Sequence, residues 1–252
     1  MPAASRSKTL TIIVPALNEE AKIADTVNAI LPLANEHLDD FEVILVDDGS
    51  TDRTGAIMDE LQTRDPRVVV IHHAERRGLG FATKEVTGIA KFEFLLLIPG
   101  DDAYRHDGIA KMFRAVGAAD VVIAYRDNQS DRSLTRSFQS HALRFFLNTL
   151  FGFGLFDYHG VPIYPVKWLR RISVEANGYG FQISALVSLL QLGLSYVQVP
   201  VSLNAELKGS SRAMRPRTYF ELCQSIILLL RRAPIRHIDA SQVPAQTERG
   251  RR

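Results

Sequence analysis

Three short apolar runs of the sequence each end in a cluster of polar and acidic residues. The clusters are Val14 to Glu20, Val46 to Asp52 and Ile98 to Ala103. Each run has the length and composition of a buried strand, and the carboxyl ends of parallel strands meet at one edge of a sheet. Carboxylates gathered there can bind a divalent metal and accept hydrogen bonds from a base and ribose, as a nucleoside diphosphate requires. The pattern predicts such a site.

The same carboxylates also allow a purely structural interpretation. Asp47, Asp48 and Asp52 could cap a helix, and Asp101 and Asp102 could form an ordinary turn. Three acidic clusters in this order favour the ligand site over that alternative. We expect Asp48 and Asp101 to be exposed loop carboxylates, whose replacement abolishes activity without unfolding the sheet.

A group of cations follows further along the chain. Arg126, Arg132 and Arg136 precede Ser140. Guanidinium groups stay charged and can meet phosphate oxygens in bidentate fashion, so this segment is a candidate phosphate site. The alternative is a solvated basic stretch beside nearby aspartates.

An aromatic segment, Leu143 to Phe156, comes next. At helical spacing its apolar side chains cover more than one face. Beside an arginine cluster they suit a helix lying in a membrane interface, and core packing is the alternative. A second amphipathic candidate, Tyr219 to Arg232, is too short to span a bilayer.

The elements that must position these residues alternate between strands and helices, which predicts an α/β fold with a mostly parallel sheet. Strands are predicted at Leu10 to Val14, Phe41 to Val46, Val68 to His72, Phe94 to Ile98 and Val121 to Ala124. Helices are predicted at Glu19 to Asn35 with Asn18 as cap, at Asp52 to Thr63 with Ser50 or Thr51 as cap, and at about Phe81 to Ala90. A buried helix and then a buried strand fit Asn177 to Ala205 better than a transmembrane helix does.

The composition of the chain argues against some classes of protein. A formal net charge of +2 over 252 residues indicates neither a nucleic-acid binder nor an acidic scaffold. With Cys223 as the single cysteine and no signal-peptide pattern, we expect a cytoplasmic protein. The histidines, His72 and His73 among them, lack metal-ligand spacing and are interpreted as surface or packing residues.

The motifs together resemble those of family 2 glycosyltransferases. Val14 to Glu20 is similar to their VPxxNEE opening, Val46 to Thr54 to VDDGSxDxT, Arg77 to Gly80 to RxxGLG, and Pro99 to Asp102 stands where the family has its DxD metal motif. Two further segments resemble the GFQ and GxSK elements of the dolichol-phosphate mannose synthase branch: Tyr179 to Gln182 and Gly209 to Arg212. The resemblance covers about Leu10 to Arg212 and implies a GT-A fold, which is Rossmann-like.

The resemblance implies roles for particular residues. The nucleotide sugar would meet Pro15, Ala16, Asn18, Glu19, Asp47, Asp48, Arg77 and Gly100. The metal, Mg²⁺ or Mn²⁺, would meet Asp101 and Asp102. Arg126 and Arg136 would receive the acceptor phosphate and count with Asp101 and Asp102 as catalytic. The acceptor would also be served by Arg132, Ser140, Gln182, Lys208 and Arg212, with the donor diphosphate as the alternative for Lys208 and Arg212.

The metal motif departs from the family pattern, because Pro99 replaces the first aspartate of DxD. Either Asp102 supplies the missing oxygen, or metal binding is weaker and depends more on the diphosphate.

The implied reaction is inverting transfer of a sugar from a GDP- or UDP-linked donor to a polyprenyl phosphate at the cytoplasmic face of a membrane. Transfer to a saccharide or lipid hydroxyl, with Asp102 as base, and a non-catalytic sugar-nucleotide-binding module are the alternatives. We expect peripheral contact with a membrane and no binding of nucleic acid. A homo-oligomer and a membrane-protein partner are further possibilities. One domain is expected over residues 1–235, with a nucleotide-sugar half at about 8–125, an acceptor half at about 126–235 that ends in an amphipathic helical extension, and a disordered tail at 236–252.

Overall fold

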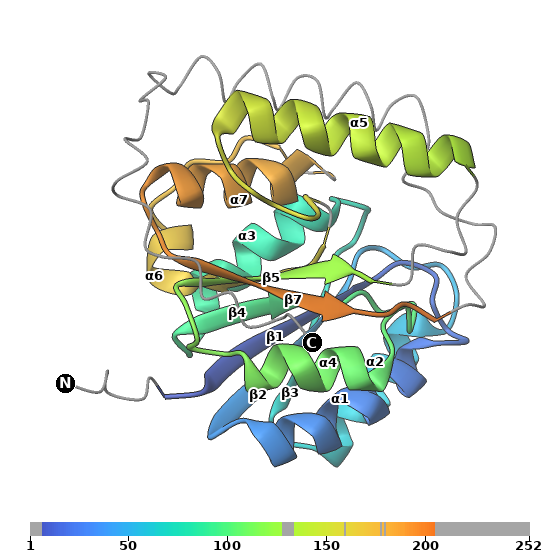
Figure 1. Ribbon diagram of the computed structural model, residues 1–252. Helices are drawn as coiled ribbons and strands as arrows, with labels where there is room; N and C mark the ends of the chain where they lie inside the picture. Colours follow the sequence, from blue (N-terminus) through green and yellow to red (C-terminus); the bar gives the residue numbers. More distant parts are fainter. Residues whose placement is uncertain (1–6, 128–133, 159, 177, 179, 205–252) are drawn as a thin grey trace.

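Figure 1 shows a twisted sheet with helices on both faces. The computed structural model describes residues 7–127, 134–158, 160–176, 178 and 180–204. Within them the strands are β1 (Thr9–Ala16), β2 (Asp40–Asp47), β3 (Val68–His72), β4 (Phe94–Leu97), β5 (Val121–Arg126), β6 (Pro162–Pro165) and β7 (Tyr196–Val201). The helices are α1 (Ile23–His37), α2 (Thr54–Arg64), α3 (Leu79–Ile89), α4 (His106–Arg114), α5 (Leu134–Phe151), α6 (Val166–Leu169) and α7 (Gly180–Gln191).

The described sheet has the strand order β3-β2-β1-β4-β6-β5-β7. The pairs β1–β2, β2–β3, β1–β4 and β5–β7 are parallel, while β6 is antiparallel to both of its neighbours. Helices α1, α2 and α4 cover one face, and α3 and α7 cover the other (Figure 1). Because both faces are covered, the central strands are mostly apolar, and Ile12, Ile13 and Val14 are fully buried.

The predicted α/β fold with a mostly parallel sheet is confirmed. All five predicted strands form, and the helix and strand expected in Asn177 to Ala205 are α7 and β7. Strand β6 was not predicted, because it is four residues long and begins and ends with a proline, which cannot donate to a sheet ladder.

Two predicted helix starts are wrong. Helix α1 begins at Ile23, because Asn18 has a left-handed φ of 56° and the carbonyl of Glu19 accepts the N–H groups of Lys22 and Ile23 in a separate turn. Helix α2 begins at Thr54, whose N–H donates to Asp52 Oδ1 at 2.9 Å. The N-cap position is Arg53, which makes no side-chain capping hydrogen bond, so neither Ser50 nor Thr51 caps this helix.

Membrane contact and core packing, the two interpretations of the aromatic segment, each account for some of its residues. Helix α5 ends at Phe151, and Leu147 and Leu155 are buried in the core. Phe145 is 75% exposed, and Phe146 and Phe156 are 51% and 53% exposed. Core packing thus accounts for Leu147 and Leu155, and three phenylalanine side chains of the segment remain exposed.

Several expectations fall on residues outside the described ranges. These are the amphipathic candidate Tyr219 to Arg232, the helical extension, the domain boundary at 235 and the tail. Where the chain is described, no helix is both long and apolar enough to cross a bilayer.

Candidate active site

The loops after β1 and β2 are held together by backbone hydrogen bonds to side chains. The N–H of Asn18 donates to Ser50 Oγ at 3.0 Å, and Asn18 Oδ1 accepts the N–H of Thr51 at 2.8 Å. The N–H of Glu19 donates to Thr54 Oγ1 at 2.8 Å. The left-handed backbone of Asn18 makes this exchange possible, since asparagine tolerates that conformation better than most residues. Asn18 and Glu19 therefore lie beside the second acidic loop.

The loop after β4 packs against the end of β1. The N–H of Gly100 donates to the carbonyl of Pro15 at 3.1 Å. A Cβ on Gly100 would lie 3.0 Å from the Cβ of Ala16, so a side chain there would require its neighbours to shift by a few tenths of an ångström. Thr26 Oγ1, which is buried, accepts the N–H of Asp102 at 3.0 Å. The three acidic loops are therefore brought to one edge of the sheet.

Asp47 is buried at the end of β2, with 7% of its surface exposed. Its Oδ1 accepts the N–H of Ser50 at 2.9 Å, and its Oδ2 lies 3.2 Å from Nδ1 of His72. Burial acts to raise the pKa of Asp47, but the hydrogen bonds from Ser50 and His72 outweigh it and lower the pKa. Asp47 is therefore a charged carboxylate in the native state at neutral pH.

Asp48 is equally buried and holds the loop that precedes α3. Its Oδ1 accepts the N–H of Arg77 at 2.8 Å, and its Oδ2 accepts that of Gly78 at 2.9 Å. The expectation that Asp48 is an exposed loop carboxylate is therefore wrong, whereas Asp101 is partly exposed. Sequence alone showed that Asp48 follows a strand, and not that a distant loop folds over it.

The sequence predicts that His72 and His73 are surface or packing residues, but both contact the aspartates at the end of β2. His72 contacts Asp47, and Nδ1 of His73 lies 3.0 Å from Asp48 Oδ1. The signal in the sequence was a pair of aspartates at the end of one strand and a pair of histidines at the end of the next strand. Their adjacency became visible only with the pairing of β2 and β3, which places Asp47 opposite His72.

The candidate metal ligands are adjacent in the loop after β4. Asp101 Oδ1 accepts the N–H of Ala103 at 3.2 Å, and Asp102 has a left-handed φ of 52°. No group of three or more His, Cys, Asp or Glu side chains is arranged to hold a metal among the described residues. This donor set fits Mg²⁺ or Mn²⁺ that takes one or two carboxylates and completes its shell with substrate phosphates and water.

Tyr104 follows the loop of the candidate metal ligands. Burial raises the pKa of the Tyr104 hydroxyl, and the charges of Asp157, Arg126 and Asp101 all act on it. Arg126, at the end of β5, is partly buried. Of these three charges, only that of Asp157 belongs to a residue that the sequence did not single out.

The other acceptor candidates are less closely defined. Arg136 lies on α5, its side chain outside the described part, and Ser140 on the same helix is partly exposed. Gln182 is buried on α7, and its backbone carbonyl accepts the Tyr164 hydroxyl at 3.2 Å. Arg132, Lys208 and Arg212 lie outside the described residues.

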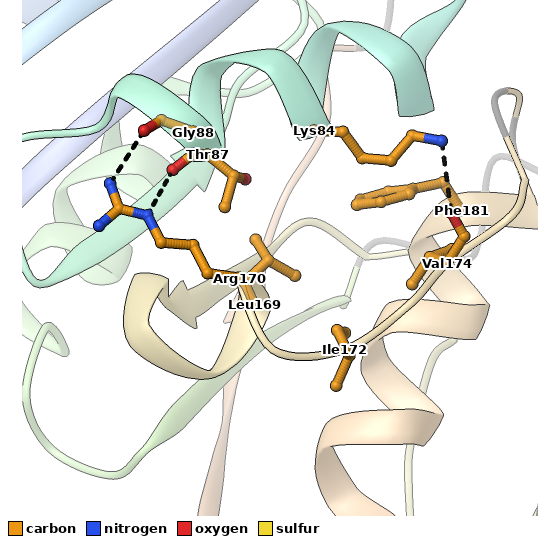
Figure 2. A pocket seen from close by; sticks show the side chains of 8 residues that line it. All are labelled: Lys84, Thr87, Gly88, Leu169, Arg170, Ile172, Val174 and Phe181. Atoms are coloured by element: carbon orange, nitrogen blue, oxygen red, sulfur yellow. Dashed lines mark hydrogen bonds between the residues drawn. The ribbon is translucent and has the colours of Figure 1, made fainter.

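A cavity of about 240 Å³ lies between α3, α6 and α7 (Figure 2). Its cations are directed at carbonyls: Arg170 donates to Thr87 at 2.9 Å and to Gly88 at 3.3 Å, and Lys84 donates to Val174 at 3.3 Å. Arg170 thereby caps the last turn of α3. This cavity is separate from the acidic loops.

Comparisons with known proteins agree with this arrangement. The family model described as glycosyl transferase family 2 matches residues 11–176. An undecaprenyl-phosphate mannosyltransferase of Micrococcus luteus is 27% identical over 211 residues, covering 79% of this chain and 85% of that protein. A polyprenol monophosphomannose synthase of Mycolicibacterium smegmatis is 29% identical over 222 residues, covering 80% of this chain and 79% of that protein.

Among solved structures, the chain is similar to glucosyl-3-phosphoglycerate synthase from Mycobacterium tuberculosis in complex with Mg²⁺ and uridine diphosphate. The TM-score is 0.66 at 19% sequence identity, covering 88% of this chain and 79% of that one. At this identity the likeness concerns the fold, and it confirms the expected GT-A architecture.

Proposed function

Because the chain belongs to glycosyl transferase family 2, we propose that it transfers a sugar from a nucleotide sugar to the phosphate of a polyprenyl phosphate at a membrane surface. Family membership makes the chain a glycosyltransferase and removes the non-catalytic module from the alternatives. The names of the two bacterial relatives support the class of acceptor. The observation that carries the proposal is the joining of the loops after β1, β2 and β4 at one edge of the sheet, where the N–H of Asn18 donates to Ser50 and that of Gly100 donates to Pro15.

The donor would lie across the carboxyl edge of β1, β2 and β4. Pro15, Ala16, Asn18, Glu19 and Asp47 line the base and ribose side in this proposal, and Arg77 and Gly100 lie toward the diphosphate. Asp48 acts by holding the backbone of Arg77 and Gly78 in place. Asp101 and Asp102 would hold Mg²⁺ or Mn²⁺, which supplies positive charge for the leaving diphosphate when bound.

The acceptor needs little acid–base help from the protein. A phosphate monoester is already ionised near neutral pH, so its oxygen can attack the anomeric carbon without a strong general base. The protein then works by positioning the two reactants and compensating their negative charges. Arg126 suits the second task, because a guanidinium stays charged and binds phosphate oxygens in pairs. Attack opposite the leaving diphosphate inverts the anomeric centre.

The membrane part of the proposal rests on α5 and the turn after it. Phe145, Phe146 and Phe156 are exposed on this element. Exposed aromatic rings on a helix near arginines suit the headgroup region of a bilayer, where a polyprenyl phosphate presents its phosphate. Peripheral contact with the cytoplasmic face would bring that phosphate to Arg126.

The test is a pair of titrations on Arg126→Ala. Losing one guanidinium from a partly desolvated phosphate contact costs about 1.5–3 kcal/mol, or roughly ten- to a hundredfold in kcat/KM for polyprenyl phosphate. Nucleotide-sugar affinity, measured by calorimetry, should stay close to wild type. Arg114→Ala is the matched control, because Arg114 is exposed in the last turn of α4.

Three outcomes separate the alternatives. Equal losses in both titrations would assign Arg126 to the donor diphosphate. Full turnover of polyprenyl phosphate by Arg126→Ala would contradict the assignment. Transfer to a saccharide hydroxyl with none to polyprenyl phosphate would replace the proposed acceptor, and Asp102 would then be the candidate base.

A further inference from the structure

His73 is a nearly buried histidine that bridges two carboxylates. Its Nδ1 lies 3.0 Å from Asp48 Oδ1, and its Nε2 lies 2.9 Å from Glu85 Oε2. The His73 side chain is 5% exposed, whereas that of Glu85 is 35% exposed. The bridge therefore joins the end of β2 to the middle of α3 through one imidazole ring.

The geometry determines how many protons the ring carries. An ionised carboxylate only accepts hydrogen bonds, and a neutral imidazole has a single N–H. Satisfying both contacts therefore requires the doubly protonated imidazolium. A protonated carboxyl group would be the other solution, but Asp48 Oδ1, the oxygen that faces the ring, already accepts the backbone N–H of Arg77. Burial opposes the charge on His73, yet the hydrogen bonds that the ring donates to Glu85 and Asp48 outweigh burial and raise its pKa.

Two residues support Arg77, and both of them contact His73. The first is Asp48, which accepts the backbone N–H of Arg77 at 2.8 Å. The second is Phe81: its ring meets His73 edge-on at 5.5 Å, and the guanidinium carbon of Arg77 lies 4.5 Å from its centre. Backbone and side chain of Arg77 are thus both placed through groups that contact His73.

We propose that His73, with Glu85, is a positioning residue for the donor: it keeps Asp48 and Phe81 where they present Arg77 to a nucleoside diphosphate. The inference rests on the proposed function for the identity of that ligand. The neighbouring His72 has no such role, because it bridges Asp47 and Asp59, is 45% exposed and contacts neither support of Arg77.

The charge on His73 makes this positioning dependent on pH. The charged groups that face the ring are Asp48 from the end of β2 and Glu85 from α3, and Arg77 is the cation on the far side of Phe81. When pH rises through the raised pKa of His73, one of the two ring hydrogen bonds is lost. Donor binding should then weaken, because the loop of Arg77 is held less firmly.

The first experiment measures GDP and UDP affinity, each with Mg²⁺, by calorimetry between about pH 6 and 9. For the nucleotide that binds wild type, His73→Gln should lower the affinity about tenfold near neutral pH, as loss of a charge-assisted contact predicts, and should flatten the pH dependence. Glu85→Gln keeps an acceptor but removes its charge, so it should shift the pH profile to lower pH and leave affinity at pH 6 near wild type. A merely structural role would not produce that shift. His37→Gln is the control, because His37 ends α1 beside Glu36, away from the acidic loops.

The second experiment observes the ring and the loop directly. Nitrogen NMR of His73 should show both ring nitrogens protonated at neutral pH, and the amides of Arg77 and Gly78 should exchange about tenfold faster in His73→Gln. A neutral His73 in the folded protein, or wild-type affinity and pH profile in His73→Gln, would overturn the inference. If wild type binds neither nucleotide, the proposed donor fails, while the NMR titration and amide exchange still decide whether His73 holds this loop.

Discussion

The side-chain amide of Asn204 donates a hydrogen bond of 2.7 Å to the backbone carbonyl of Asp102. Further contacts run alongside: the N–H of Asn204 donates to Ala103 at 2.9 Å, and Leu203 forms an antiparallel bridge with Tyr104. The segment after β7 therefore holds the loop of the candidate metal ligands, although the two are about a hundred residues apart in sequence.

Asn204→Ala should weaken metal binding without altering any proposed ligand. Losing one hydrogen bond of about 1 kcal/mol loosens the loop of Asp101 and Asp102, so the Mn²⁺ concentration for half-maximal activity should rise about fivefold. Metal titrations of transfer at saturating donor would measure the change. Asn35→Ala, which removes an exposed asparagine on α1, is the control. An unchanged metal dependence would show that this hydrogen bond does not support metal binding by the loop.

Asp101 and Asp48 should fail in different ways when each is replaced by asparagine. Asp101→Asn removes a partly exposed charge, so turnover should fall at least about a hundredfold while the melting temperature stays near wild type. Asp48→Asn disturbs a buried acceptor of two backbone N–H groups and should also cost about 1–3 kcal/mol of stability. Melting temperature and turnover, measured for both variants, distinguish them. Near-normal turnover of Asp101→Asn at saturating metal would remove Asp101 from the site.

The exposed rings of α5 should govern membrane affinity. Replacing Phe145 and Phe146 together by serine removes two apolar anchors and should weaken binding to anionic vesicles about tenfold or more. Because both rings are exposed, the melting temperature should change little. Flotation at low and high salt is the measurement, since salt screens the cations and leaves apolar insertion intact. Ile89→Ser, at a 53% exposed position on α3, is the control; an equal loss there would argue against a specific membrane face.

The stability of the protein should fall on the alkaline side through His72. Hydrogen bonds to Asp59 and then Asp47 raise the pKa of His72 above its ordinary 6.5, against the effect of burial. A raised pKa stabilises the fold fully below the unfolded value, and this contribution is lost as pH rises through the folded value. Melting temperatures from about pH 6 to 9 should decline less steeply in His72→Gln than in wild type. Parallel curves would show that His72 is not charged in the fold.

The sequence by itself determined the order of the strands along the chain and the place of the acidic loops. Apolar runs such as Phe41 to Val46 need burial on both faces, and their carboxyl ends must share an edge when the sheet is parallel. That reasoning located Asp47, Asp48 and Asp101 without coordinates. It also placed Arg126 at the end of its strand.

The tertiary structure decided what each of these residues touches. Several contacts join separate elements of the chain. Asp48 accepts the N–H of Gly78, His73 contacts Glu85, and Asn204 donates to the loop of the candidate metal ligands. Local periodicity carries no information on such pairs, because they form only when strands pair and helices pack on the sheet. Strand β6 belongs here too: its two prolines argue against a strand, and it forms because β4 and β5 both offer it a partner.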